Sequence, residues 1–140
     1  MNEYTVEFRI VSEDLVPASI TGDLGLQPTI TRLRRNDTKR TDPSKTFVWG
    51  YDGFTSDRRR AKGWPTLGEG LEFLLKKLTP LKNKIDAYKT KYEVFFWCGR
   101  FQDSNFESST ELSPEILKSL GDFGVKVLLS TYVSETGAQK

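Results

Sequence analysis

The sequence predicts an α+β domain in which a mixed, mostly antiparallel sheet of about five strands carries two or three packed helices. Three patterns lead to this expectation. Residues 4–11 alternate between apolar and polar side chains, as a half-buried strand does. Residues 67–88 carry apolar side chains at helical spacing, and residues 92–101 are apolar on both sides, as in a central strand. Because strands and helices interleave along the chain, we expect them to pack around one core.

The amino-terminal part is predicted to hold one strand, one short helix and a long connection. Residues 4–11 form the strand. The helix has about two turns and ends at Gly25, where glycine permits the left-handed stop. Residues 29–45 have no clear period and are rich in Arg, Asp, Thr and Pro, so they are predicted to be a connection that is partly extended near Ile30 and Leu33.

The clearest signal in the chain is a helical stripe that follows a capping box of Thr66 and Glu69. Ahead of it, residues 47–51 have the composition of a strand. Pro80 interrupts the helical hydrogen bonds, so the stripe is predicted to be either a kinked helix or two helices that share one buried face. Its apolar positions, at alternating spacings of four and three, are Leu67, Leu71, Leu74, Leu78, Leu81, Ile85 and Tyr88.

The carboxyl-terminal part is predicted to add three strands and a helix. Residues 92–101 form a central strand covered on both faces, and the alternating residues 106–112 form its antiparallel hairpin partner. A helix begins at the Ser113 cap and stops at Gly121. Residues 125–133 form the last strand.

The predicted element order is therefore β-α-β-α-β-β-α-β. From the second strand onward, this order matches the split β-α-β pattern of ferredoxin-like folds, preceded by an extra strand and helix. We expect one α+β domain over residues 1–134 and a polar carboxyl-terminal tail over residues 135–140.

The inventory of reactive side chains is short. The chain of 140 residues has a net charge of +2, no histidine and one cysteine, Cys98. No protein imidazole can act as a base or metal ligand, and one cysteine cannot form an internal disulfide or a thiolate zinc site. We therefore expect no metal, no cofactor and a core role for Cys98. The chain shows neither a leader peptide nor an apolar run of spanning length, which predicts a cytoplasmic protein with no membrane partner.

The charges are unevenly distributed. Residues 32–62 contain ten basic and four acidic residues, a local charge of +6 that leaves −4 on the remainder. If the loops on either side of residues 47–51 lie side by side, they form a basic rim with tryptophans nearby. The predicted binding residues of this basic rim are Arg32, Arg34, Arg35, Arg58, Arg59, Arg60, Lys62, Trp49 and Trp64.

The basic rim has three interpretations. Its arginines could simply be solvated, with both tryptophans serving as core or loop anchors. Arginines also suit an acidic protein surface. Arginines interleaved with aromatic side chains suit phosphates and stacked bases, although no helix-turn-helix, RNA-binding or zinc-finger motif is present.

Several stretches together resemble a known family. They are residues 20–29 with their LGLQP run, residues 47–49, the LTPL of residues 78–81, the LSPE of residues 112–115 and the final Thr-Tyr pair at residues 131–132. The pattern resembles a bacterial family catalogued as a domain of unknown function, number four-two-seven-nine. The resemblance implies a shared fold over about residues 4–133 and a bacterial cytoplasm, and it carries over no catalytic residues. Small α+β families of this kind include immunity proteins that neutralise toxins, which is an analogy of fold alone.

The expected function is non-catalytic binding of an acidic protein partner through the basic rim, as an immunity protein binds a toxin. The alternative is a nucleic-acid-binding module that uses the same arginines and tryptophans. An enzyme without histidine chemistry, built on carboxylates or arginines, is the third reading. The chain is expected to be a monomer or a homodimer through an exposed edge strand or the leucine stripe.

Overall fold

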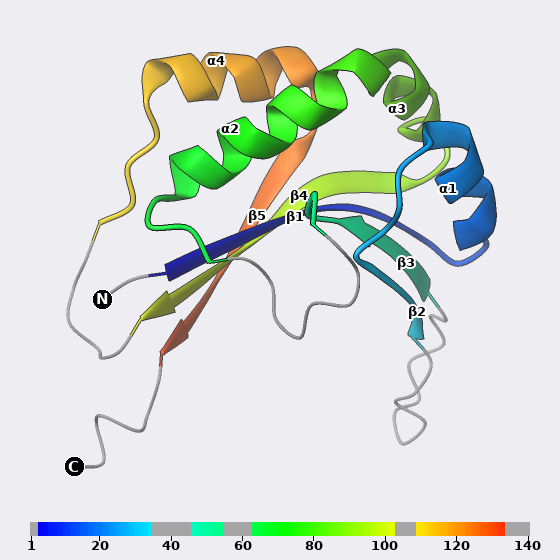
Figure 1. Cartoon of the computed structure of the whole chain (residues 1–140), viewed down its shortest axis with the longest axis horizontal. Helices are drawn as coiled ribbons and strands as arrows, with labels where there is room; N and C mark the ends of the chain where they lie inside the picture. Colours follow the sequence, from blue (N-terminus) through cyan, green and yellow to red (C-terminus); the bar gives the residue numbers. More distant parts are fainter. Residues whose placement is uncertain (1–2, 35–45, 55–62, 103–108, 134–140) are drawn as a thin grey trace.

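The computed structural model describes residues 3–34, 46–54, 63–102 and 109–133. One five-stranded sheet has the strand order β2-β3-β1-β4-β5, and the helices lie together on one of its faces (Figure 1). The strands are β1 (Glu3–Ser12), β2 (Ile30–Arg34), β3 (Thr46–Tyr51), β4 (Glu93–Gln102) and β5 (Lys126–Val133). The helices are α1 (Pro17–Leu24), α2 (Leu67–Leu78), α3 (Lys82–Tyr88) and α4 (Pro114–Phe123), with a 3₁₀ turn, η1 (Thr79–Leu81), between α2 and α3.

The predicted fold class is confirmed. Strand β1 pairs antiparallel with both β3 and β4, β2 pairs antiparallel with β3, and only the β4–β5 pair is parallel among the named strands. The first four strands and the helices α1 and α2 reproduce the ferredoxin-like order. Helix α4 and strand β5 are then added by a parallel crossover, so the extra strand and helix follow the ferredoxin-like unit rather than precede it.

The predicted hairpin partner of the central strand is wrong for the part that the structure describes. Residues 106–108 lie outside the described residues, and residues 109–113 form no strand. This stretch approaches the start of β1 instead, where the hydroxyls of Tyr4 and Thr110 are 2.7 Å apart, and Leu112 packs against the core. The burial of this connection alternates, with Thr110 and Leu112 half-buried between exposed Ser109 and Glu111, so its sequence carries the same alternation as a strand.

The strand pair lies earlier in the chain, within the stretch predicted as a partly extended connection. Strand β2 pairs with β3 from Ile30 opposite Gly50 to Arg34 opposite Thr46. The expected extension near Ile30 and Leu33 is confirmed. The composition of β2 is only a weak strand signal, because two of its five residues are arginine and only Ile30 and Leu33 are aliphatic.

The core lies between the sheet and the helices. From the sheet it takes alternate residues of β1 and β4, of which Phe8, Ile10, Phe96 and Cys98 are fully buried. From the helices it takes the leucine stripe, of which Leu67, Leu71, Leu74, Leu78 and Ile85 are buried. The stripe is two helices end to end, because α2 gives way to the 3₁₀ turn that contains Pro80 before α3 begins.

Helix ends follow the predicted caps with one change. The Thr66 hydroxyl accepts a hydrogen bond from the Glu69 backbone N–H at 3.2 Å, and the Ser113 hydroxyl accepts one from Ile116 N–H at 3.1 Å. Helix α4 does not stop at Gly121. It continues to Phe123, and Gly124 with φ of 85° makes the left-handed stop, which brings buried Phe123 onto the core.

Candidate functional site

The structure describes four of the nine predicted binding residues of the basic rim. Arg32 and Arg34 lie on β2, Trp49 lies on β3, and Trp64 follows the second basic stretch. The other five fall outside the described residues: Arg35, Arg58, Arg59, Arg60 and Lys62.

Arg32 and Arg34 occupy an outer strand of the sheet. Strand β2 is terminal in the strand order, and its register places Arg32 opposite Val48 and Arg34 opposite Thr46. Residues two apart on a strand belong to the same side of a sheet. The two arginines therefore occupy positions on the same side of an outer strand.

Trp49 belongs to the core and presents no surface to a partner. Its exposed fraction is 0%, and its indole N–H donates to the Thr21 hydroxyl on α1 at 3.0 Å. Its ring stacks on Tyr51 at a centroid distance of 6.1 Å and meets the edge of Phe8 at 6.5 Å. Of the two interpretations of Trp49, the core anchor is therefore the one the geometry fits, because a fully buried ring cannot contact a partner.

Trp64 is a loop anchor at the sheet. It makes two backbone hydrogen bonds with Tyr4, one in each direction, at 2.9 and 2.6 Å. Its half-buried ring lies 5.3 Å from that of Phe73 on α2 and 6.4 Å from that of Phe54. Phe54 and Phe73 themselves stack at 5.2 Å. Phe54 and Trp64, which flank residues 55–62 in the sequence, therefore both belong to an aromatic cluster with Phe73.

The attachment points of the two basic stretches lie at opposite ends of β3. Residues 35–45 join Arg34 to Thr46, which are cross-strand neighbours. Residues 55–62 instead follow Phe54, beyond the other end of the strand at Tyr51. Five steps along a strand span about 17 Å at about 3.3 Å per residue. The described ends of the two basic stretches are thus separated by the length of β3, whereas the prediction of a basic rim places the two stretches side by side.

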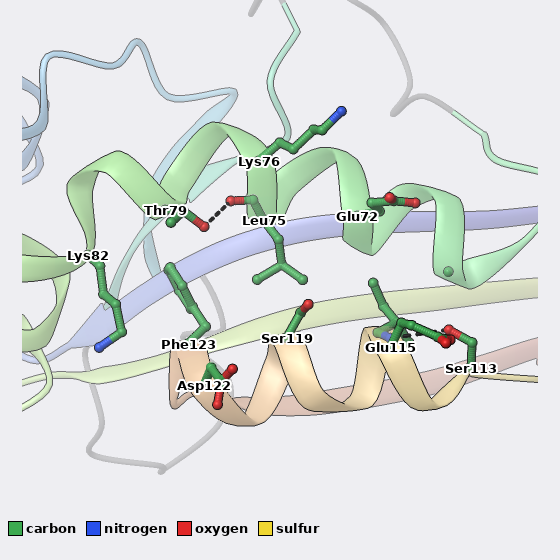
Figure 2. A pocket seen from close by; sticks show the side chains of 12 residues that line it. Glu72, Leu75, Lys76, Thr79, Lys82, Ser113, Glu115, Ser119, Asp122 and Phe123 are labelled. Carbon is green, nitrogen blue, oxygen red and sulfur yellow. Dashed lines mark hydrogen bonds between the residues drawn. The ribbon is translucent and has the colours of Figure 1, made fainter.

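A groove between α2 and α4 is a second candidate site, and the sequence reading missed it (Figure 2). It has a volume of about 580 Å³. Buried Leu75, Ile116 and Phe123 are among its lining residues, and Leu75 points from α2 toward α4 while Phe123 points from α4 toward α2. The amphipathic pattern predicted both helices, but the distance between them depends on tertiary packing.

The polar border of the groove carries charges of both signs. Exposed Glu72 on α2 and Glu115 on α4 are among its acidic residues. Lys82 also lines the groove and is paired with Asp86 at 2.8 Å, and hydrogen bonds from Lys82 and Lys89 lower the pKa of that carboxyl. An apolar inner part with mixed charges at the border suits an amphipathic ligand better than a phosphate or another small anion.

Cys98 has the properties of a core residue. It is fully buried on β4, and burial raises the pKa of its thiol to about 12. A thiol that stays protonated at neutral pH is a poor nucleophile. Within the described ranges, no group of three or more acidic or cysteine side chains is placed to hold a metal ion.

Residues 2–134 match the profile of a family described as a domain of unknown function, DUF4279. No curated protein and no solved structure gives a significant match. Among the described helices, none is both long enough and apolar enough to cross a membrane.

Proposed function

The chain belongs to the DUF4279 family, and from this premise we propose that it is a non-catalytic binding protein that contacts an acidic protein partner through its basic rim. The observation that carries the proposal is the division of charge, +6 within residues 32–62 against −4 elsewhere. Complementary charge speeds encounter and selects among partners more than it adds affinity.

The described residues next to the two basic stretches are held by the sheet and by the aromatic cluster. Arg32 and Arg34 lie on a strand paired with β3. Phe54 and Trp64, on either side of residues 55–62 in the sequence, are held in the aromatic cluster with Phe73. Fixing both ends of a loop lowers the entropy that it loses on binding. Because the two attachment points lie at opposite ends of β3, we propose that the partner surface is broad or that one basic stretch dominates.

The absence of histidine and the buried, protonated Cys98 support a role without catalysis. A free buried thiol also fits a reducing compartment, and we place the protein in a bacterial cytoplasm. In this setting an immunity-type role, in which the acidic partner is a toxin, is the specific form of the proposal.

The test is recovery of the tagged full-length chain from its host, followed by affinity measurements with the partner identified by mass spectrometry. Two variants divide the basic rim: Arg58, Arg59 and Arg60 changed together to Ala, and Arg32 and Arg34 changed together to Ala. We expect at least one of them to weaken binding by about tenfold or more, with a marked salt dependence.

The control changes three exposed lysines of α2 and α4, Lys76, Lys77 and Lys118, to Ala. It removes three positive charges from outside the rim, as many as the triple arginine variant removes from within it. This control should leave affinity within about twofold. Loss of affinity equal to that of the arginine variants, or the absence of any protein partner, contradicts the proposal. Recovery of nucleic acid, with a log–log salt slope near one unit per neutralised phosphate, favours the alternative.

A further inference from the structure

Strand β5 forms the sheet edge opposite to β2, and its surface is apolar. Four of the large hydrophobic side chains with high exposure lie on β5 and its neighbour β4: Phe101 at 39%, Leu128 at 40%, Leu129 at 44% and Tyr132 at 47%. Phe101 and Tyr132 stack at a centroid distance of 5.0 Å. This edge therefore exposes apolar side chains on both sides of the sheet, and Leu128, Tyr132 and Phe101, which share one side, form its apolar stripe.

The sequence of this edge strand lacks several of the features that ordinarily prevent strands from pairing. Its residues 127–133 contain no charge, no proline and no glycine. Lys126, the only charged residue of β5, is already paired with Glu93 on β4. The opposite edge differs in composition, because two of the five residues of β2 are arginines, and charged residues on an edge strand disfavour pairing with another chain.

The lack of charge on residues 127–133 favours a second copy of the same strand as the partner of this edge. A strongly charged partner finds no counter-charge on residues 127–133, whereas an identical strand matches both the hydrogen-bonding edge and the apolar stripe. We propose that two copies of this chain associate by antiparallel pairing of their β5 strands, which joins the two sheets into one of ten strands. This association uses the edge opposite to Arg32 and Arg34, so it is independent of the proposed function.

The side-chain pattern sets the register of this pairing. Val127 and Leu129 pair with core residues Phe96 and Cys98 and so belong to the helix side, whereas Leu128 and Tyr132 pair with Trp97 and Phe101 and belong to the open side. A two-fold axis perpendicular to the sheet pairs residues of the same side. An axis at Ser130 places Leu128 of each copy opposite Tyr132 of the other, which covers the largest exposed side chains of the open side.

The small exposed area indicates that the association of two copies is weak. A large side chain that is about 40% exposed leaves about 80 Å² uncovered, so the four residues offer about 300 Å² per copy. Together with the paired backbones this is a small interface of the transient class. We expect a dissociation constant of about 10 to 100 µM, so association should depend visibly on concentration.

The first experiment is sedimentation velocity of the full chain from about 1 to about 500 µM. The mass should rise from the 16.0 kDa monomer toward twice that value. Leu128→Lys and Tyr132→Lys should each weaken association at least tenfold. Val16→Lys is the control, because Val16 is 56% exposed beside α1, which packs over β3. Circular dichroism and the urea midpoint establish that each variant is folded.

A second experiment tests the register without adding charge. Ser130→Cys should form an intermolecular disulfide on mild oxidation, because cross-strand neighbours on a two-fold axis lie about 4.5–5.5 Å apart between Cα atoms. Ser19→Cys, exposed on α1, is the control, and the native Cys98 is buried. A monomer at all concentrations, association unchanged by Leu128→Lys, or no faster cross-linking at position 130 than at position 19 would overturn the proposal.

Discussion

Replacement of Trp49 by Phe tests directly whether this residue belongs to the core or to a binding surface. The smaller ring loses the indole N–H bond to Thr21, worth about 1 kcal/mol. It also removes about three buried ring atoms, which costs about 1 kcal/mol in transfer free energy and about 1 kcal/mol for the space left unfilled. Trp49→Phe should therefore lower the free energy of unfolding by about 3 kcal/mol.

Urea unfolding followed by circular dichroism measures this loss. The midpoint should fall by about 1.5 M at an unchanged slope, since the surface exposed on unfolding barely changes. In a double-mutant cycle with Thr21→Val, the coupling between the two positions should be about 1 kcal/mol. Tyr132→Phe, at a 47% exposed ring, is the control and should change stability by no more than about 0.5 kcal/mol.

Two results would refute this reasoning. A loss below about 1 kcal/mol would mean that the Trp49 ring contributes little to the core. If Trp49→Phe leaves the stability unchanged and weakens binding of the partner protein, Trp49 belongs to the binding surface rather than to the core. The expected result is the opposite combination, in which stability falls and partner affinity per folded molecule stays the same.

Three further predictions follow from the buried thiol and the helix ends. The folded Cys98 thiol keeps its proton to about pH 12, whereas the unfolded thiol loses it near pH 9.0. The free energy of unfolding of the native chain, compared with that of Cys98→Ala, should therefore fall by about 1.4 kcal/mol per pH unit between these values. Parallel pH profiles of the two proteins would contradict the burial of the thiol. Ser113→Ala removes the hydroxyl that caps Ile116 N–H and should cost about 1 kcal/mol in urea unfolding, and an unchanged midpoint would show that the cap is not formed in solution. Gly124→Ala places a side chain at φ of 85° and should lower the free energy of unfolding by about 1 kcal/mol. Gly121→Ala lies in the helix interior with open space around it and should raise the free energy of unfolding by up to about 1 kcal/mol. The opposite pair of effects would show that α4 ends at position 121.

Much of the fold was predictable because the buried positions of a helix or strand recur in the sequence with the period of that element. The alternation of residues 4–11 and the leucine stripe of residues 67–88 each report one buried face, and both elements formed as expected. The caps at Thr66 and Ser113 were equally local, since each joins a hydroxyl to an N–H three residues away.

The errors arose where local pattern and tertiary partner diverge. Residues 109–112 end an alternation that predicts a strand, yet they form a connection in which the Thr110 hydroxyl contacts that of Tyr4, 106 residues away. Strand β2 has little apolar content and owes its existence to pairing with β3. No window of a few residues contains that information.

The candidate sites divide in the same way. The charge of residues 32–62 is a property of composition and was read from the sequence. The burial of Trp49, the groove between α2 and α4 and the exposure of the β5 edge were not. Each of these depends on which distant segment packs beside the residue concerned.

By itself, the sequence determined the α+β class, most of the secondary structure, most of the core side chains and the division of charge. Only the tertiary structure decided the strand order β2-β3-β1-β4-β5, the separation of the two basic stretches by the length of β3, and the contrast between a basic edge at β2 and a neutral edge at β5. The physical reason is that periodicity records whether a residue is buried, whereas neighbours across a sheet are selected by contacts between segments far apart in the chain.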